Sequence, residues 1–344
     1  MTPHEYLVVE LTEACPHACV HCYNYWREDR APVLSPDTLS RKQILTLVRT
    51  VRRDAPIKVV ALSGGEPLLR TDVAGICSDL VNDGLSVAVI TSGALLTPER
   101  AAKFPIDTTF EMTLFGADAA LHDRIVGRAG AFDRVLNGAV SARERGCSLV
   151  VSVVLNRLNA GHTRDAFELG IALGADAFLF NRMNFSRLTL PQASQLGPTV
   201  DQLKQALDAA ETIAVDYGAS ISVSVPIPPC VLDLTPYSHL HFGWCPRGSA
   251  QAYYTVSHNG MLRPCNHSSV VLGDLRQQRF AALVNGRKAA NFWTPVPAEC
   301  KTCEHPLRDV CRGGCPAASD ESYGTRDSVD PLVQLARIEA SCVC

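Results

Sequence analysis

Three cysteines near the start of the chain have the spacing of ligands to a compact metal cluster. Cys15, Cys19 and Cys22 are separated by three and then two residues. Thiolates favour soft metals and iron–sulfur clusters, and three protein ligands leave one iron open to bind a substrate or cofactor directly. The alternative is a zinc site completed by His17 or His21. The spacing alone leaves both chemistries open.

Most of the other cysteines, of 14 in the chain, crowd its last third. They are Cys230, Cys245, Cys265, Cys300, Cys303, Cys311, Cys315, Cys342 and Cys344. In a cytosolic protein such clustered thiols stay reduced and act as metal ligands or catalytic groups. This region has little continuous apolar pattern, and bound metal could stabilise it. A zinc ribbon is the alternative. Cys77 and Cys147 lie between the two groups and are predicted to be structural.

Composition excludes several classes of protein. The 344 residues are 47% hydrophobic and 19% charged, which is typical of a globular chain with a large core. The net charge of −3 carries no basic stripe, which argues against a nucleic-acid binder and a membrane-surface protein. There is no apolar run of about 18 residues, and the first residues lack the order of a signal peptide. We therefore expect a cytoplasmic protein.

Alternating strands and helices must position these residues. Short apolar strands are predicted at 6–11, 58–62, 87–90, 109–114, 149–155 and 177–180. A helix is expected to begin near Ser35-Pro36, and further helical patterns separate the strands, up to a helix over 200–217. Such repeats predict an α/β fold with a parallel sheet, as a partial (β/α)6 TIM-type barrel rather than an open sheet. The predicted domains are 1–225, the barrel, and 226–344, a small cysteine-rich domain with short strands and helices.

Polar and glycine residues follow the predicted strands at the point where each strand ends. They are Ser63-Gly64-Gly65-Glu66-Pro67, Thr91-Ser92-Gly93, Phe115-Gly116, Asn156 and Asn181-Arg182. The cysteines 15–22 follow the first strand in the same way. In a β/α barrel all of these lie at the carboxyl-terminal rim, where such folds place their active sites. The sequence therefore predicts one site at that rim.

The segment Cys15-Pro16-His17-Ala18-Cys19-Val20-His21-Cys22 resembles the motif of the radical S-adenosylmethionine (radical SAM) enzymes. Residues 63–67 look like the family's GGE segment, which holds the amino group of the cofactor, and residues 91–93 stand where relatives often have Thr-Asn-Gly. The resemblance implies that the three cysteines bind a [4Fe–4S] cluster whose open iron chelates S-adenosylmethionine. One electron then cleaves the cofactor to a 5′-deoxyadenosyl radical, which abstracts hydrogen from a substrate.

The same resemblance implies a set of cofactor contacts. They are His21, Gly64, Gly65, Glu66, Thr91, Ser92, Thr113, Asn156 and Arg182. Thr113 corresponds to a serine that contacts the cofactor in close relatives. Relatives carry an arginine that reaches the cofactor carboxylate at the position of Val126, so either Arg128 or Arg182 replaces it or the carboxylate is held differently.

The C-terminal cysteines resemble the SPASM extension, which carries auxiliary iron–sulfur clusters. By that likeness the first auxiliary cluster is held by Cys230, Cys245, Cys265 and Cys315, and the second by Cys300, Cys303, Cys311 and either Cys342 or Cys344. The family's usual position for the last ligand is Val333 here. Asn266 stands where sulfatase-maturating relatives have a catalytic aspartate, and an amide cannot accept a proton at neutral pH. We therefore do not expect sulfatase maturation.

The resemblance favours modification of a ribosomally made peptide, by cross-link formation or epimerisation. The alternatives are a small-molecule dehydrogenase or epimerase acting on an aminocyclitol or sugar, and a non-catalytic iron–sulfur or zinc scaffold. The latter would leave the polar rim unexplained. An electron donor such as flavodoxin or ferredoxin is expected. Because the first strand begins by Tyr6, we expect any leader-binding module to be a separate protein. Cys230 has a second possible role, as a hydrogen donor to a substrate radical.

Overall fold

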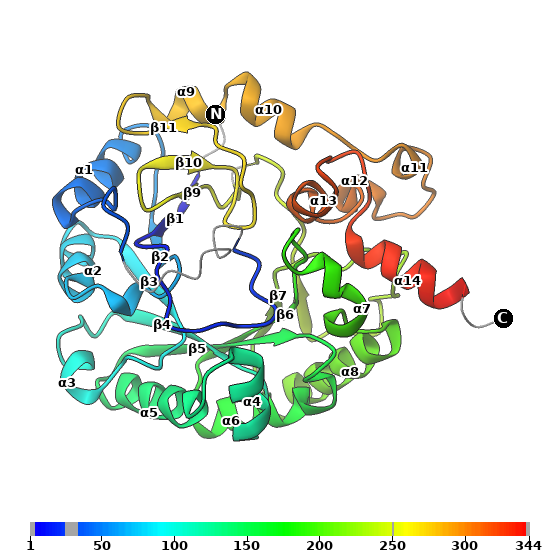
Figure 1. Ribbon diagram of the computed structural model, residues 1–344, viewed down its shortest axis with the longest axis horizontal. Helices are drawn as coiled ribbons and strands as arrows, with labels where there is room; N and C mark the ends of the chain where they lie inside the picture. Colours follow the sequence, from blue (N-terminus) through cyan, green and yellow to red (C-terminus); the bar gives the residue numbers. More distant parts are fainter. Residues whose placement is uncertain (1–3, 25–33, 250, 342–344) are drawn as a thin grey trace.

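The structure is a computed structural model, and it describes residues 4–24, 34–249 and 251–341. Eight parallel strands form one curved sheet with helices around its outer side (Figure 1). They are β1 (Tyr6–Glu10), β2 (Val59–Ser63), β3 (Ser86–Thr91), β4 (Thr108–Leu114), β5 (Ser148–Leu155), β6 (Ala177–Arg182), β7 (Ile221–Val223) and β8 (Leu240–Phe242). The α/β class and the parallel sheet are confirmed.

Helices alternate with these strands and then continue through the C-terminal region. They are α1 (Arg41–Val51), α2 (Val73–Asn82), α3 (Pro98–Ala101), α4 (Ala119–Val126), α5 (Ala131–Glu144), α6 (Thr163–Ala172), α7 (Ala193–Leu196), α8 (Val200–Tyr217), α9 (Phe280–Val284), α10 (Arg287–Trp293), α11 (Ala298–Lys301), α12 (Arg308–Cys311), α13 (Pro316–Tyr323) and α14 (Pro331–Ser341). Short 3-10 turns occupy Pro67–Leu69, Ala160–His162 and Leu190–Gln192. No helix in the described parts of the chain has both the length and the apolar character needed to cross a membrane.

Helix α1 begins later than the sequence pattern indicated. Its start was predicted near Ser35-Pro36, and the structure starts it at Arg41 with Ser40 as N-cap. The Ser40 side chain accepts a hydrogen bond from the Gln43 N–H, and the Gln43 side chain accepts one from the Ser40 N–H at 2.9 Å. This reciprocal capping satisfies two backbone N–H groups that would otherwise lack a partner at the start of the helix. A serine followed by proline does not satisfy both. The predicted start was therefore wrong.

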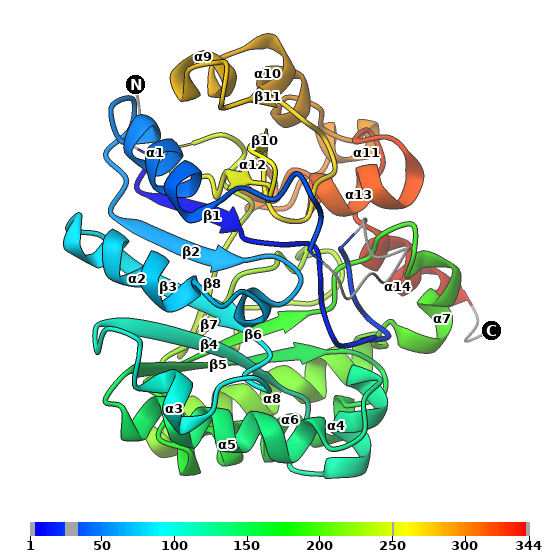
Figure 2. The ribbon, with the colours of Figure 1, turned by 60° about the vertical axis from the view of Figure 1, so that its left-hand side comes forward.

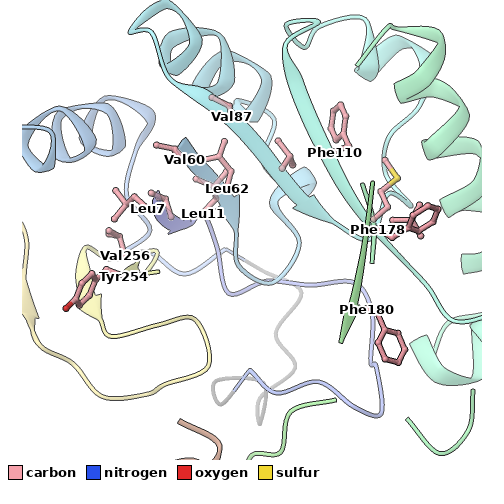
Figure 3. Close-up of a cluster of buried hydrophobic side chains, with 14 of the residues drawn as sticks. Leu7, Leu11, Val60, Leu62, Val87, Phe110, Phe178, Phe180, Tyr254 and Val256 are labelled. Atoms are coloured by element: carbon pink, nitrogen blue, oxygen red, sulfur yellow. The ribbon is translucent and has the colours of Figure 1, made fainter. Parts of the chain in front are cut away.

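Alternation along the strands separates the two faces of the sheet. Leu7, Val60, Val87, Phe110 and Phe178 are almost fully buried and belong to one apolar core (Figure 3). Burying one such side chain stabilises the fold by roughly 1.5–3 kcal/mol. On each strand, the residues that alternate with these core residues point to the inside of the curved sheet. Polar residues are found on this inner face and at the ends of the strands.

The C-terminal strands extend this sheet. They are β9 (Thr255–Val256), β10 (Met261–Arg263) and β11 (Gly273–Asp274), and β9 pairs in parallel with β1. Strands β9 and β10 pair antiparallel as a hairpin, and Gly260 in the turn between them adopts a φ of 88°. Because β1 pairs with β9, the barrel stays partial, as predicted.

The C-terminal region also shares the core of the barrel. Tyr254 and Val256 belong to the same apolar cluster as Leu7 and Leu11 (Figure 3). Figure 2 shows α13 and α14 on the side toward which β1 and β2 point, which is also the side of the loop after β1. The boundary predicted at residue 226 lies between β7 and β8, which pair with each other, so the sheet runs across it. As a domain boundary it stays a prediction.

Candidate active site and iron–sulfur centres

The three N-terminal cysteines lie on the loop that follows β1. Cys15, Cys19 and Cys22 are all half-buried there. The loop is attached to the end of α4, because the Ala18 N–H donates to the Val126 carbonyl oxygen at 3.0 Å. Its cysteines therefore sit on backbone that two elements hold in place, at the carboxyl-terminal rim that the sequence predicted.

The glycine pair after β2 lies directly against this cysteine loop. The Gly65 N–H donates to the Thr12 carbonyl oxygen at 2.7 Å. A Cβ atom on Gly64, whose φ is +127°, would lie 2.3 Å from the same oxygen. A Cβ atom on Gly65 would lie 2.2 Å from the Ala14 carbonyl oxygen. Only glycine allows this approach, so the pair fixes the loop that carries the cysteines.

Glu66, Thr91 and Ser92 form one hydrogen-bonded group between the ends of β2 and β3. Glu66 is 1% exposed. Its Oε1 accepts from the Thr91 hydroxyl at 2.5 Å and from the Leu68 N–H at 3.0 Å. Its Oε2 accepts from the Ser92 hydroxyl at 2.5 Å and from the Ser92 N–H at 2.9 Å. A carboxylate bound by four donors is rigid, and this one holds two rim loops together.

Two further predicted contacts reach the rim from other directions. The His21 ring packs edge-on against Phe115, with centroids 4.9 Å apart, at the end of β4. Thr113 is half-buried on β4 and points to the inside of the sheet, because its neighbours Met112 and Leu114 are in the core. Both residues therefore border the region that the cysteine loop covers.

Asn156 has a local structural role in the described contacts. It is fully buried after β5. Its side-chain oxygen accepts from the Leu158 N–H at 3.0 Å, and its own N–H donates to the Asn159 side chain at 2.8 Å. These bonds close the turn after β5. Its predicted contact with the cofactor stays a prediction.

Arg182 points toward the C-terminal region rather than the cysteine loop. It forms a fully buried ion pair with Asp330, which lies just before α14. It also donates to the Pro226 carbonyl oxygen at 3.0 and 3.1 Å. Arg128, the other candidate for the cofactor carboxylate, donates to the Pro16 carbonyl oxygen on the cysteine loop at 2.9 Å. Of the two, Arg128 is the one that contacts this loop.

Sequence reasoning missed a contact between the cysteine loop and the C-terminal region. Asn266 donates from its side-chain nitrogen to the Tyr23 hydroxyl at 2.9 Å, and the Tyr23 ring meets the edge of His267 at 4.3 Å. Removal from water, with the charges of Arg182 and Arg263 nearby, lowers the pKa of His267 to about 4. His267 is therefore neutral at pH 7. The sequence signal for this contact was the position of the two residues next to predicted cluster ligands: Tyr23 follows Cys22, and His267 follows Cys265 by two residues.

The C-terminal cysteines fall into two groups by their electrostatic contacts. In the first group Cys245, Cys265 and Cys315 influence one another. Burial raises the pKa of the Cys245 thiol to about 12, and the charge of Cys315 adds to this. In the second group Cys300 interacts with Cys311, Cys230 and Cys303, and its pKa is raised to about 11, mainly by burial.

The sequence-based assignment had placed Cys230 in the first group. The thiol is exposed and interacts electrostatically with Cys303 and Cys311 of the second group, and its assignment to the first cluster stays a prediction. Cys342 and Cys344 lie outside the described residues. Among the residues that the structure describes, no three His, Cys, Asp or Glu side chains are arranged as ligands of a single metal ion.

The residues present fit iron–sulfur clusters and S-adenosylmethionine. Each thiol group combines soft donors from separate segments, and the positive charge of bound iron would offset the energetic cost of burying the thiolates. At the rim, the glycine pair has no side chains beside the cysteine loop, and the carbonyl oxygen of Gly64 accepts a hydrogen bond from the Asn24 side-chain nitrogen at 3.4 Å. A carbonyl oxygen has two lone pairs, so the Gly64 oxygen could also accept from an ammonium group.

Comparison with protein families identifies both parts of the chain. Residues 9–170 match the radical SAM superfamily, and residues 245–315 match the SPASM iron-sulfur cluster-binding domain. The chain belongs to the radical SAM superfamily. It is a radical SAM enzyme with a C-terminal SPASM domain, and its cofactors are S-adenosylmethionine and iron–sulfur clusters.

Relatives named PqqA peptide cyclase match almost the whole chain of this radical SAM enzyme. The PqqA peptide cyclase of Methylocella silvestris is 28% identical over 343 residues, which cover 96% of this chain and 87% of the relative. The PqqA peptide cyclase of Rhodopseudomonas palustris is 25% identical, with 96% and 86% covered.

Solved structures share the fold of this radical SAM enzyme. SuiB of Streptococcus suis bound to S-adenosylmethionine matches with a TM-score of 0.74 at 14% identity, covering 97% of this chain and 78% of that one. Native anSMEcpe with bound AdoMet matches with a TM-score of 0.72 at 15% identity, covering 96% of this chain and 94% of that one.

Proposed function

We propose that this radical SAM enzyme forms a covalent cross-link within a ribosomally synthesised peptide. The observation that carries the proposal is the likeness to PqqA peptide cyclases, which runs through both the barrel and the thiol-rich region and covers 96% of this chain. A likeness confined to residues 9–170 would support only the radical chemistry. The matched C-terminal thiols support an oxidative outcome.

The reaction removes two hydrogen atoms from the peptide for each bond formed. One leaves as a hydrogen atom, and the other leaves as a proton and an electron. The bound cofactors supply the 5′-deoxyadenosyl radical that takes the hydrogen atom, and an auxiliary cluster is the kind of centre that accepts an electron. Epimerisation differs because it returns a hydrogen atom and leaves the peptide mass unchanged.

The residues of this chain hold and orient the reactants. Cys15, Cys19 and Cys22 would hold the cluster that binds the cofactor, and Glu66 keeps the rim loops rigid through its four hydrogen bonds. The contact of Tyr23 with the 265–267 segment joins this loop to the first auxiliary thiol group. A preorganised rim of this kind limits the freedom of a reactive substrate radical.

The experiment combines the anaerobically reconstituted enzyme with S-adenosylmethionine, a reductant and each short peptide encoded by a gene next to its own. We expect a product that is lighter by two hydrogen atoms and one 5′-deoxyadenosine per product. The triple variant Cys15→Ala/Cys19→Ala/Cys22→Ala should form neither, while it keeps its auxiliary iron. A product of unchanged mass that has gained solvent deuterium would indicate epimerisation instead. Turnover of an aminocyclitol or sugar, with the peptide untouched, would support a small-molecule enzyme.

We also propose that an acidic electron-donor protein of the flavodoxin or ferredoxin kind docks near the second thiol group. An open cavity of about 940 Å³ there is lined by Cys300. Its charged lining residues are four cations, Lys301, Arg308, Arg312 and Arg326, and two carboxylates, Asp309 and Asp327, so cations are in excess. Charge complementarity of this kind raises association rates. The double variant Arg308→Glu/Arg312→Glu should be reduced more slowly by flavodoxin and at an unchanged rate by dithionite, whereas equal rates with flavodoxin would contradict this docking site.

Two further proposals concern the surroundings of the reaction. We propose a cytoplasmic location, because the thiols must stay reduced to assemble clusters. We also propose that a separate protein binds the leader of the precursor peptide. Formation of product by the purified enzyme without such a protein would contradict this.

A further inference from the structure

A short turn between α12 and α13 joins the two groups of auxiliary thiols (Figure 1). Residues 312–314 start directly after Cys311, of the second group, and end directly before Cys315, of the first. Their φ angles are all positive, at 47°, 91° and 88°. A Cβ atom on Gly313 would lie 3.4 Å from the Sγ atom of Cys300, so the turn also packs against a further thiol of the second group. This connecting turn therefore lies between the two thiol groups.

The guanidinium group of Arg247 is hydrogen-bonded to the connecting turn. Its Nη2 atom donates to the Arg312 carbonyl oxygen at 2.7 Å and to the Gly314 carbonyl oxygen at 3.4 Å. Its Nη1 atom donates to the Pro295 carbonyl oxygen at 3.1 Å. The Gly314 carbonyl is part of the peptide bond to Cys315, so the guanidinium contacts the backbone of a predicted cluster ligand.

The backbone is strained on both sides of this contact. Arg247 has a φ of 42° and Arg312 a φ of 47°, and they are the only non-glycine residues with a positive φ in the part of the chain that the structure describes. Side chains rarely adopt this conformation, and it persists only where the surrounding contacts impose it, often at functional sites. Because the two strained residues are hydrogen-bonded to each other, both strained positions belong to one contact between the thiol groups.

One donor of Arg247 is left over. Its Nε atom is shielded from water and has no hydrogen-bond partner among the described residues. A buried N–H of this kind costs free energy unless a bound group accepts from it. Arg247 follows Cys245 by two residues, and it interacts electrostatically with the thiols of Cys245, Cys315 and Cys311. A cation with a spare donor among thiols of both groups suits anionic iron–sulfur clusters and their thiolate ligands.

We propose that Arg247 is a positioning residue for both auxiliary clusters, which holds the connecting turn in place and directs its positive charge and its remaining Nε–H toward them. A cluster that accepts an electron gains one unit of negative charge, and a nearby cation and N–H donor stabilise that reduced form. Arg247 therefore raises the reduction potentials of both clusters. The inference rests on the SPASM domain, and its test uses no peptide, so it can fail or hold independently of the proposed cross-linking.

The test measures these potentials in a chain that keeps only the auxiliary clusters. The background carries alanine in place of Cys15, Cys19 and Cys22, and redox titrations are followed by electron paramagnetic resonance. Arg247→Gln removes the charge, and Arg247→Lys keeps the charge but removes the Nε–H. Arg276→Gln is the matched control, because it removes an equal charge from an ion pair with Asp274 that lies in the segment after β11.

Arg247→Gln should lower the potentials of both auxiliary clusters. We expect the equilibrium constant for reduction to fall about tenfold, which corresponds to about 59 mV for one electron. Arg247→Lys should lower the potentials by less, and Arg276→Gln should keep the values of the background. Unchanged potentials in both Arg247 variants would overturn the proposal. A shift confined to one cluster would overturn the role of Arg247 for both.

A second measurement reports the Nε–H contact directly. The background protein is labelled with ¹⁵N in arginine alone, and pulsed electron paramagnetic resonance detects coupling of ¹⁵N to the reduced clusters. We expect a coupling that disappears in Arg247→Lys and stays in Arg276→Gln. A coupling that Arg247→Lys leaves unaltered would come from another arginine and would contradict the proposed contact.

Variants that lose iron also decide the question. If Arg247→Gln loses the auxiliary iron, Arg247→Lys carries the test: lower potentials support the proposal, and unchanged potentials overturn it. If both variants lose the iron, circular dichroism of the iron-free proteins decides. An unchanged fold would show that the clusters require the arginine, as proposed. Loss of the fold would show that Arg247 serves the polypeptide alone, and the proposal would be wrong.

Discussion

Glu111 offers a quantitative test of how the inside of the barrel is solvated. It lies on β4 on the same face as Thr113, two residues along the strand, and it interacts electrostatically with Tyr6 on β1. Burial raises the pKa of Glu111 from 4.5 to about 7. The carboxyl group is therefore protonated in the folded protein at pH values where it is ionised in the unfolded chain.

The sign of the stability change follows from this difference. A raised folded-state pKa means that the stability is fully present below pH 4.5 and is lost as the pH rises through 7. At about 1.4 kcal/mol per pKa unit, the loss by pH 8 is about 3 kcal/mol, and solvent screening of this half-buried group lowers it to about 2 kcal/mol. Glu111→Gln cannot ionise, so it should keep this stability.

The assay is anaerobic urea unfolding at pH 5.5 and at pH 8. The wild type should lose more free energy of unfolding between the two pH values than Glu111→Gln, and the gap between them should widen by about 1–2 kcal/mol. Glu144→Gln, an exposed change at the end of α5, is the control and should follow the wild type. Parallel behaviour of Glu111→Gln and the wild type would refute the reasoning, because it would mean that water solvates Glu111 in the folded state.

Three further predictions concern the site. Asp330→Asn or Arg182→Met should destabilise the protein by about 3–5 kcal/mol in thermal unfolding, because each leaves a buried charge unpaired, and the double variant should cost less than the sum of the two. Glu66→Gln should weaken S-adenosylmethionine binding about tenfold in calorimetric titration with iron content unchanged, because an amide cannot accept all four hydrogen bonds; unchanged affinity would contradict a positioning role. Gly65→Ala should lower the iron of the N-terminal cluster but not of the auxiliary clusters, because its Cβ would overlap the Ala14 carbonyl oxygen.

The sequence was sufficient for features that depend on local patterns. The strands and the rim positions followed from apolar runs ended by glycine and polar residues, and helix α8 begins and ends where it was predicted. The start of α1 was missed because the capping pair Ser40 and Gln43 was not weighed against the proline signal. Contacts between distant residues gave no local signal. Arg182 and Asp330 are 148 residues apart, and Tyr23 and Asn266 are 243 apart.

The open edge of the barrel explains why the two kinds of thiol site meet. In a closed barrel β1 would pair with the last parallel strand, but here β1 pairs with β9. The chain between β8 and β9 carries Cys245, and the chain after β10 carries Cys265. Arg263, at the end of β10, forms a buried ion pair with Glu10 at the end of β1, five residues before the first cysteine ligand, Cys15. The first auxiliary group therefore occupies the seam where the sheet does not close on itself, and its position relative to the N-terminal cysteines is set by strand pairing rather than by a flexible linker.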